Sequence, residues 1–363
     1  MNIALISPNK TSYSETFIEA QKNGISGKVF YYYDGAPPTK LEGKGSIIIP
    51  FGDFRKRYGL LFKDVKSQSL KTSFKKHKID VVLAHYGPTG ESVVDVCSAL
   101  KIPLVVHFHG YDAAIQSVIS KNNNYTKVFE YATAVIAVSK LMTSLLISLG
   151  CPEEKIIYNP CAPSDAFLHI NPNFKKPQFL ALGRFVDKKA PYLTLLAFKK
   201  VVDLYPTAYL IMGGDGPLRN TCINLAKQFG LVNHVAFPGA ITSTQFQKDL
   251  KESLAFVQHS ITADNGDMEG TPVAILEASA AGLPVVSTYH AGIPDVIIHE
   301  QTGLLCHEHD VDTMAEHMLR LLRDVDYSKQ LGQSGKAYIK ANFSMEHHLS
   351  TLQQVLESAV KNT

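Results

Sequence analysis

The sequence predicts an α/β protein of two Rossmann-like domains, each built on a parallel sheet. Its 363 residues are enough for about two domains of ordinary size. Short apolar runs alternate with longer helix-like segments along the chain, as they do in βαβ units. Some of these runs, such as 81–84 and 134–138, are apolar throughout. Uninterrupted apolar runs are typical of parallel strands that are buried on both faces.

Two series of strands are expected, with a break between them. The first series comprises 2–7, 28–33, 46–50, 81–85, 104–107 and 134–138. The second comprises 179–183, 208–213, 234–238, 255–259, 284–288 and 303–305. Two prolines within 159–164 disfavour regular structure between the series. We therefore expect one domain over 1–164 and another over 165–344. The tail 345–363 is expected to hold a final amphipathic helix, from 345 to 361, with Ser344 as its N-cap.

Composition excludes several classes of protein. A formal net charge of +3 is too small to indicate nucleic acid as the main partner. No apolar run is long enough to cross a bilayer, and the short apolar start lacks the basic flank of a signal peptide. Five scattered cysteines predict reduced, buried thiols and a cytoplasmic location. The basic segment 55–78 is either a solvated helix face or a contact with an anionic membrane surface.

The strongest local motif spans 267–278. Thr271 is expected to cap a helix that has Pro272 at its first position and ends near Ala281, before Gly282. The backbone amides at this helix start form a binding site for a diphosphate or for sugar hydroxyls. Gly270, just before the cap, allows a ligand to approach the backbone closely.

Two glutamates flank the start of this helix. Glu269 lies in the preceding loop, and Glu277 lies more than one turn inside the helix. The two carboxylates can therefore address different parts of one extended ligand.

Basic residues and glycines follow other predicted strands of the second domain. Arg184 follows strand 179–183, and Lys189 lies in the same loop. A guanidinium and an ammonium at a strand end suit a pyrophosphate and can replace a metal ion in stabilising a departing diphosphate. The turn 213–217 lacks the full dinucleotide glycine pattern, but it could let a nucleotide come close.

Two histidines follow strand 104–107 in the first domain. His107 and His109 have a spacing that could bind a metal, as in some hydrolases, although no further ligands stand at later strand ends. We expect His109 to be neutral and to hydrogen-bond a sugar hydroxyl. His107 is expected to be a core histidine with satisfied hydrogen bonds.

Together these segments resemble the retaining nucleotide-sugar glycosyltransferases of family four. Glu269 and Glu277, with seven residues between them, match the paired-glutamate motif of that family. Further matches are the segments 183–185 and 188–189, the glycine turn at 213, and the segments 237–239, 109–112 and 138–140. Segments 14–17 and 287–294 are similar to bacterial members that build surface polysaccharides. The glycine-rich loop usual after the first strand is replaced by Ser7-Pro8-Asn9-Lys10.

The resemblance implies a fold and a set of site residues. The fold would be GT-B, in which two Rossmann-like domains face each other across a cleft and a C-terminal helix returns to the N-terminal domain. The residues that would contact the donor, the sugar or the acceptor are Arg184 and Lys189 (diphosphate), Glu277 (ribose), Glu269, Gly270 and Thr271 (sugar), Gly214, Gly239 and Ala240 (nucleotide and base), His109 (reacting face), and Ser14, Glu15 and Asp112 (acceptor side).

The resemblance also implies a reaction. A hexose would pass from a nucleotide-diphosphate sugar to an acceptor hydroxyl with retention, without a metal or another cofactor. A UDP-sugar is expected rather than a GDP-sugar, and a carbohydrate or lipid-linked saccharide is expected as acceptor. The setting would be polysaccharide or lipopolysaccharide assembly in bacteria, in the cytoplasm or at the inner face of the membrane. The alternatives are an epimerase or a sugar phosphorylase of the same fold, a non-catalytic nucleotide-sugar binding protein, and a metal hydrolase using His107 and His109.

Overall fold

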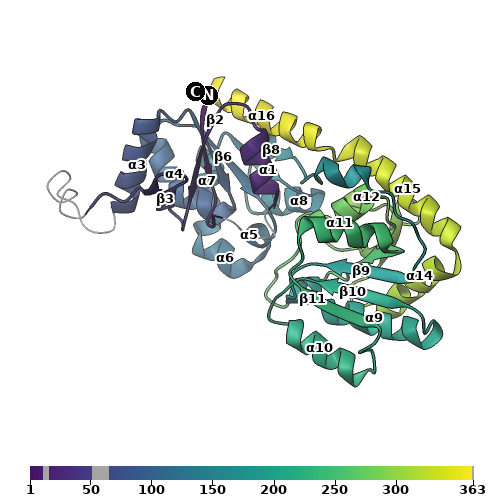
Figure 1. The fold of residues 1–363 in the computed structure, drawn as a ribbon. Coiled ribbons are helices and arrows are strands. Elements are labelled where there is room, and N and C mark those ends of the chain that lie inside the picture. Colours follow the sequence, from purple (N-terminus) through teal and green to yellow (C-terminus); the bar gives the residue numbers. More distant parts are fainter. Residues whose placement is uncertain (11–15, 51–64, 362–363) are drawn as a thin grey trace. The chain divides into compact units, whose positions relative to one another are not determined.

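The computed structural model describes residues 1–10, 16–50 and 65–361. Ser14 and Glu15, and the part of the basic segment up to residue 64, lie outside the described residues. The chain divides into two compact units (Figure 1). The first contains Met1–Pro160 together with Glu346–Thr363, and the second contains Cys161–Met345. The observed division thus falls at residue 160, and the sequence placed it at residue 164.

The first unit is built on a sheet with the strand order β4-β3-β2-β1-β5-β6-β7-β8. Its six longer strands run parallel, and the short β3 and β4 add an antiparallel edge. The strands are β1 (Asn2–Ile6), β2 (Lys28–Tyr33), β3 (Lys40–Leu41), β4 (Gly45–Ser46), β5 (Val81–His85), β6 (Leu104–Phe108), β7 (Ala134–Ala137) and β8 (Ile156–Tyr158).

One predicted strand of this sheet, 46–50, is wrong. The chain instead turns back at Gly43 and Gly45, whose φ angles are 74° and 77°. Glycine populates this left-handed region readily, and the turn leaves only Gly45 and Ser46 to pair with β3. The sequence also did not predict β3 or β8, which are two and three residues long.

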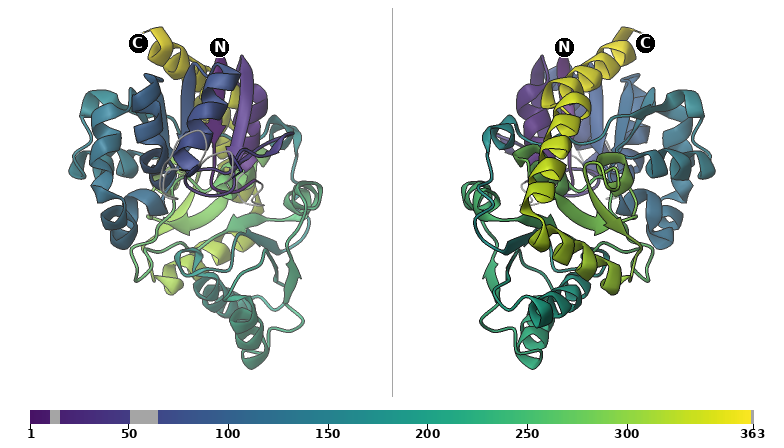
Figure 2. Two further views of the ribbon diagram at one scale, coloured as in Figure 1. Left: turned by 90° about the vertical axis from the view of Figure 1, so that its left-hand side faces the viewer. Right: turned by 90° about the vertical axis from the view of Figure 1, so that its right-hand side faces the viewer.

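Helices surround the first sheet, and the last helix of the chain is one of them. They are α1 (Thr16–Gly24), α3 (Val65–His77), α4 (Gly87–Leu100), α5 (Tyr111–Ala114), α6 (Gln116–Lys121), α7 (Thr126–Tyr131), α8 (Lys140–Ser148) and α16 (Met345–Lys361). Helix α16 begins directly after Ser344 and lies along the first unit (Figure 2). The Gln353 side chain accepts a bond from the Ser26 amide at 2.9 Å. The predicted return of this helix to the N-terminal domain is confirmed.

The second unit has a six-stranded sheet that is parallel throughout, with the order β11-β10-β9-β12-β13-β14. Its strands are β9 (Gln178–Leu182), β10 (Tyr209–Gly213), β11 (Val235–Gly239), β12 (Ala255–Val257), β13 (Val285–Thr288) and β14 (Gly303–Cys306). Its helices are α9 (Pro191–Leu204), α10 (Arg219–Gln228), α11 (Ser243–Glu252), α12 (Val273–Ala281), α13 (Ile293–Val296), α14 (Val311–Arg323) and α15 (Val325–Asn342). Apolar side chains of the sheet, such as Phe179 and Val257, pack with Phe198 of α9 and Met314 of α14 in one core.

The order in which the chain adds strands changes direction at β9, and this switch point indicates where a ligand would bind. The chain begins at β9 in the middle of the sheet, extends outward to β11, and then crosses over to β12 on the other side of β9. Loops leaving the carboxyl ends of β9 and β12 therefore diverge, and ligands of open parallel sheets bind in the crevice between such loops.

Two other sequence predictions concern cysteines and the membrane. All five cysteines are buried thiols, as predicted. Among the helices of the described residues, none combines the length and the apolar character needed to cross a membrane.

Candidate functional site

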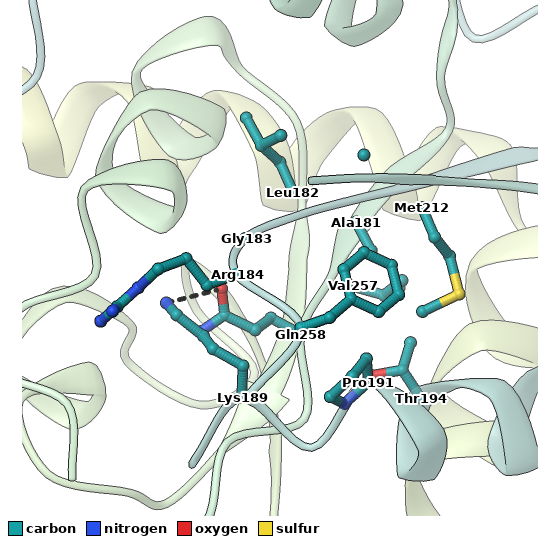
Figure 3. A pocket seen from close by; sticks show the side chains of 12 residues that line it. Ala181, Leu182, Gly183, Arg184, Lys189, Pro191, Thr194, Met212, Val257 and Gln258 are labelled. Atoms are coloured by element: carbon teal, nitrogen blue, oxygen red, sulfur yellow. Dashed lines mark hydrogen bonds between the residues drawn. The ribbon is translucent and has the colours of Figure 1, made fainter. Parts of the chain in front are cut away.

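A pocket lies at the switch point of the second sheet. Its lining includes Gly183 and Arg184 after β9, Gln258 after β12, and Lys189 and Pro191 at the start of α9 (Figure 3). The sequence placed Arg184 and Lys189 in one loop at a strand end, and the structure brings both to this pocket. The crevice between diverging loops is therefore lined by two basic side chains.

The two basic residues have different surroundings. The Arg184 side chain is exposed and extends away from Val257 and Met212 (Figure 3). In the described part of the chain no acidic group forms a salt bridge with it. The Lys189 ammonium is largely buried, 3.1 Å from Oε2 of Glu269, and donates to Oε1 of Gln258 at 3.4 Å. Arg184 is thus an available cation at the pocket, and Lys189 is a cation already held by a carboxylate.

Glu269 is one of the most buried acidic residues of the second unit, with 8% of its surface exposed. Oε2 pairs with Lys189, whereas Oε1 is buried and lacks a hydrogen-bond partner among the described residues. Burial opposes ionisation, but the ammonium groups of Lys189 and Lys188 outweigh it and hold the pKa of Glu269 below its usual value. Glu269 therefore offers an ionised oxygen with unused acceptor capacity, and a buried acceptor of this kind is costly unless a ligand satisfies it.

Helix α12 carries the second glutamate. The structure places its N-cap at Pro272 rather than at Thr271 as predicted, because the Pro272 carbonyl already accepts the first helical bonds, from the amides of Ile275 and Leu276. The helix ends at Gly282 in the left-handed conformation, as predicted. Burial raises the pKa of Glu277 to about 8. Within the described residues, neither a hydrogen bond nor a salt bridge engages this carboxyl group.

The glycine turn after β10 is explained by contacts inside the protein. Gly214 has a φ of 124°, and a Cβ there would come within 1.9 Å of the Gly183 carbonyl oxygen. Its amide donates to the Gly239 carbonyl at 2.7 Å. The structure thus brings Gly214 and Gly239 together beside the Arg184 loop, with exposed Ala240 next to them. The need for glycine at position 214 comes from the close packing of these loops.

Three histidines cluster in the first unit, at the carboxyl ends of β5 and β6. His85 and His107 pair across the two strands, and Nδ1 of His85 lies 3.0 Å from Nε2 of His109. Burial, together with His85 and His348, holds the pKa of His109 well below its usual value. His109 is therefore neutral near pH 7, as expected from the sequence.

The expectation of a satisfied His107 is wrong. His107 is fully buried, but neither ring nitrogen has a hydrogen-bond partner among the residues described. The reason is that His85 and His109, its neighbours, hydrogen-bond each other. One nitrogen from each of the three histidines could bind a common metal ion, since these atoms lie within 4.8 Å of one another. Metal-bound histidines normally anchor their second nitrogen on an oxygen, and the described residues supply no such anchor to His107.

Asp112, expected on the acceptor side, is instead an internal anchor. It is fully buried, and its carboxylate accepts from the amides of Gly87, His109 and Gly110 at 2.9–3.3 Å. Asp112 therefore fixes the loop that carries His109, and its oxygens are occupied by backbone donors.

Two family models match the chain, one in each half. The model described as "Glycosyl transferases group 1" matches residues 167–338, and that described as "Glycosyltransferase Family 4" matches residues 19–162. The first match contains the pocket residues Arg184 and Lys189, and also both glutamates. The second contains the histidine cluster. The chain belongs to the glycosyltransferases that these two models describe.

Curated relatives agree with this assignment, and a solved structure shares the fold. WcaL of Salmonella typhimurium, provisionally assigned to colanic acid biosynthesis, is 30% identical over 252 residues, which is 67% of this chain and 62% of WcaL. The amylovoran biosynthesis glycosyltransferase AmsK of Erwinia amylovora is 28% identical over 83% of this chain and 76% of its own length. Anabaena HepE, solved with UDP and glucose, has a TM-score of 0.78 at 16% identity, covering 99% of this chain and 100% of HepE. The predicted GT-B fold is confirmed.

Some residues around the glycosyltransferase site were given no role by the sequence. Lys188 is buried and donates to Oδ1 of Asp267 at 2.9 Å and to the Met268 carbonyl at 3.0 Å. Gln258 accepts from Lys189. His290 accepts from the Glu269 amide at 3.1 Å. Each contact joins residues that are between 21 and 80 positions apart, so no local pattern could have indicated it.

Proposed function

We propose that this glycosyltransferase moves a hexose from a nucleoside-diphosphate sugar to an acceptor hydroxyl, with retention of the anomeric configuration. The observation that carries the proposal is the buried Lys189–Glu269 pair, whose second carboxylate oxygen is unsatisfied, beside an exposed Arg184. A cation pair suits a diphosphate, and an ionised buried acceptor suits sugar hydroxyls. Both stand at the switch point where ligands of such sheets bind.

Arg184 and Lys189 would bind the diphosphate. The bond between the anomeric carbon and the diphosphate oxygen breaks, the acceptor oxygen bonds to that carbon on the same face, and the hydroxyl proton passes to the departing diphosphate. Negative charge grows on the diphosphate as this happens, and fixed cations stabilise it most in the transition state. These two side chains therefore take the role that a metal ion has in other transferases, and the reaction proceeds without a metal or another cofactor.

Glu269 and Glu277 would bind the donor's hydroxyl groups. The unsatisfied Oε1 of Glu269 would accept from the donor sugar, with Gly270 and Thr271 beside it. Glu277, in the middle of α12, would bind the ribose. Its carboxyl has a pKa of about 8, so it can accept a hydrogen bond from one ribose hydroxyl and donate one to the other. The backbone around Gly239 and Ala240 would line the base.

The donor and the acceptor are inferred from relatives. A UDP-sugar is favoured because HepE, which shares the fold, was solved with UDP and glucose. Assembly of a bacterial surface polysaccharide is favoured by WcaL and AmsK, so the acceptor would be a carbohydrate or a lipid-linked saccharide. Neutral His109 would hydrogen-bond the reacting sugar or the acceptor.

A membrane surface is the proposed place of action, on its cytoplasmic side. Helix α3 and the residue after it present exposed lysines, which are Lys66, Lys75, Lys76 and Lys78. The apolar side of this helix is buried through Val65, Leu70 and Phe74. Exposed lysines gain roughly 1 kcal/mol each near an anionic bilayer, which would bring the enzyme to a lipid-linked acceptor.

Transfer can be tested with nucleotide sugars that carry a labelled hexose. Wild-type enzyme, a bacterial lipid-linked oligosaccharide extract and one labelled donor at a time are incubated together, and the product linkage is determined by NMR. The proposal predicts an α-linked product from an α-linked donor, formed without added metal. A β-linked product contradicts retention, and hydrolysis or epimerisation without transfer contradicts the transferase itself.

A further inference from the structure

The loop that carries Glu269 is long and irregular. It runs from residue 258, after β12, to residue 272, before α12. Irregular loops of this length in compact domains are uncommon and are usually functional. Such a loop places a side chain reliably only if other residues hold its backbone. Lys188 is one such residue, because it donates to Asp267 and to the Met268 carbonyl. A second pair of residues also holds the loop backbone.

This pair consists of His290, which follows β13, and Glu308, which follows β14. Nε2 of His290 lies 3.1 Å from the backbone nitrogen of Glu269, and Nδ1 lies 2.7 Å from Oε1 of Glu308. A backbone N–H can only donate, so Nε2 must accept and carry no proton. The proton of the neutral ring is then on Nδ1, where it is donated to Glu308.

Glu308 also holds the beginning of the same loop. Its second oxygen, Oε2, accepts from the backbone N–H of Thr262 at 2.9 Å. One carboxylate therefore fixes the loop at residue 262 directly and at residue 269 through His290. The side chain of His290 is 1% exposed and that of Glu308 is 28% exposed. His290, which links Glu308 to the Glu269 amide, is therefore shielded from water.

We propose that Glu308 is a positioning residue for Glu269, acting through the tautomer of His290. By keeping the proton on Nδ1, Glu308 leaves Nε2 free to accept from the Glu269 amide. The carboxylate of Glu269 is then held where Lys189 meets it. This inference rests on the role of Glu269 in sugar binding that is proposed above.

E308Q tests the inference because the amide has the shape of the carboxylate but only one accepting oxygen. It can accept from Thr262 or from His290, and its NH₂ then faces the other donor. In either orientation one of the two loop contacts is lost. The matched control is E316Q, which makes the same change at an exposed glutamate of α14.

We expect E308Q to lower kcat for transfer by up to about 100-fold, which is the size of effect that a displacement of about 1 Å can have. The affinity for the free nucleoside diphosphate should stay at the wild-type value, because that ligand lacks the sugar. Wild-type kcat in E308Q overturns the inference. An equal loss of diphosphate affinity also overturns it, because the damage would then be general.

Variants of the histidine separate a hydrogen-bonding role from simple packing. H290Q keeps one acceptor and one donor, whereas H290M keeps the bulk without either. H290Q should retain most of the transfer rate that H290M loses. Equal rates in the two variants overturn the hydrogen-bond account.

Hydrogen exchange gives a readout that does not depend on activity. In E308Q, backbone amides of peptides from 262–270 should exchange faster, while those of 285–288 in β13 should be unchanged. Unchanged exchange at 262–270 overturns the inference. E269Q is measured alongside: if E269Q transfers at the wild-type rate, the proposed function fails, whereas a dead E269Q with a wild-type E308Q removes only the role of Glu308.

Discussion

The ammonium of Lys189 and the carboxylate of Glu269 form a buried ion pair, with 3.1 Å between Nζ and Oε2. Burial lowers the pKa of Lys189, against the opposing effect of Glu269, while Lys189 and Lys188 hold the pKa of Glu269 down. Each charge is therefore stable in this environment only because the other is present.

Removing one member of this pair should destabilise the protein. K189M leaves an uncompensated buried carboxylate, and we expect the free energy of unfolding to fall by about 3–5 kcal/mol. The double variant K189M/E269Q should lose less than the sum of the single variants, because no unpaired charge remains. Urea denaturation measures all three. K329M, which breaks an exposed pair, is the control and should change little; additive losses in the double variant would contradict the account.

Arg184 should affect catalysis without affecting stability. Its side chain is exposed, so R184A should unfold at the wild-type temperature. Transfer should fall more than donor affinity, because negative charge on the diphosphate is greatest in the transition state. Steady-state kinetics and calorimetric donor binding distinguish the two effects. K248A, an exposed lysine of the same unit, should be neutral, and an R184A enzyme with normal kcat would remove Arg184 from the mechanism.

Glu277 should make stability depend on pH. Its pKa is 4.5 in a reference peptide and about 8 in the folded protein, so between these values the folded state binds more protons than the unfolded state. Its contribution is fully present below pH 4.5 and is lost as pH rises through about 8. E277Q cannot ionise, so its stability relative to wild type should rise with pH across this range. Thermal unfolding of both proteins from pH 5 to pH 9 checks this, and parallel profiles would contradict it.

Metal removal should leave transfer unchanged. Arg184 and Lys189 supply the positive charge at the proposed diphosphate site, and the three-histidine cluster lacks anchoring oxygens for His107 among the described residues. Enzyme dialysed against EDTA should therefore keep its kcat and its unfolding temperature. Stoichiometric zinc in the untreated protein, lost together with activity on dialysis, would contradict this prediction.

Much of the fold and part of the site could be predicted from local patterns. The strands, apart from 46–50, β3 and β8, are apolar runs long enough to recognise. Arg184, Lys189 and Glu269 lie at a strand end or just before a helix, and Glu277 lies inside the helix that follows Glu269. Their types suit a diphosphate and hydroxyl groups. The prediction of a strand over 46–50 failed because the glycine turn at 43–45 redirects the chain.

Contacts between distant residues could not be predicted in this way. Glu308 meets His290, the partner of the Glu269 amide, only because β13 and β14 are neighbours in the sheet. The same holds for His85, which meets His109 because β5 and β6 pair. The resemblance placed Asp112 on the acceptor side. The sequence alone does not show that its carboxylate accepts from the Gly87 amide of α4, which is 25 positions away.

The second unit is proposed to bind a nucleoside-diphosphate sugar through the paired glutamates. Thermal unfolding with UDP, GDP, ADP and their sugar conjugates tests it directly, in wild type and in E277A. A ligand at 100 times its Kd should stabilise the fold by about 2.7 kcal/mol, which is a visible shift in unfolding temperature. Nucleotides of one base family should stabilise the wild type and not E277A. Equal stabilisation of both proteins, or none of either by any nucleotide, would contradict it.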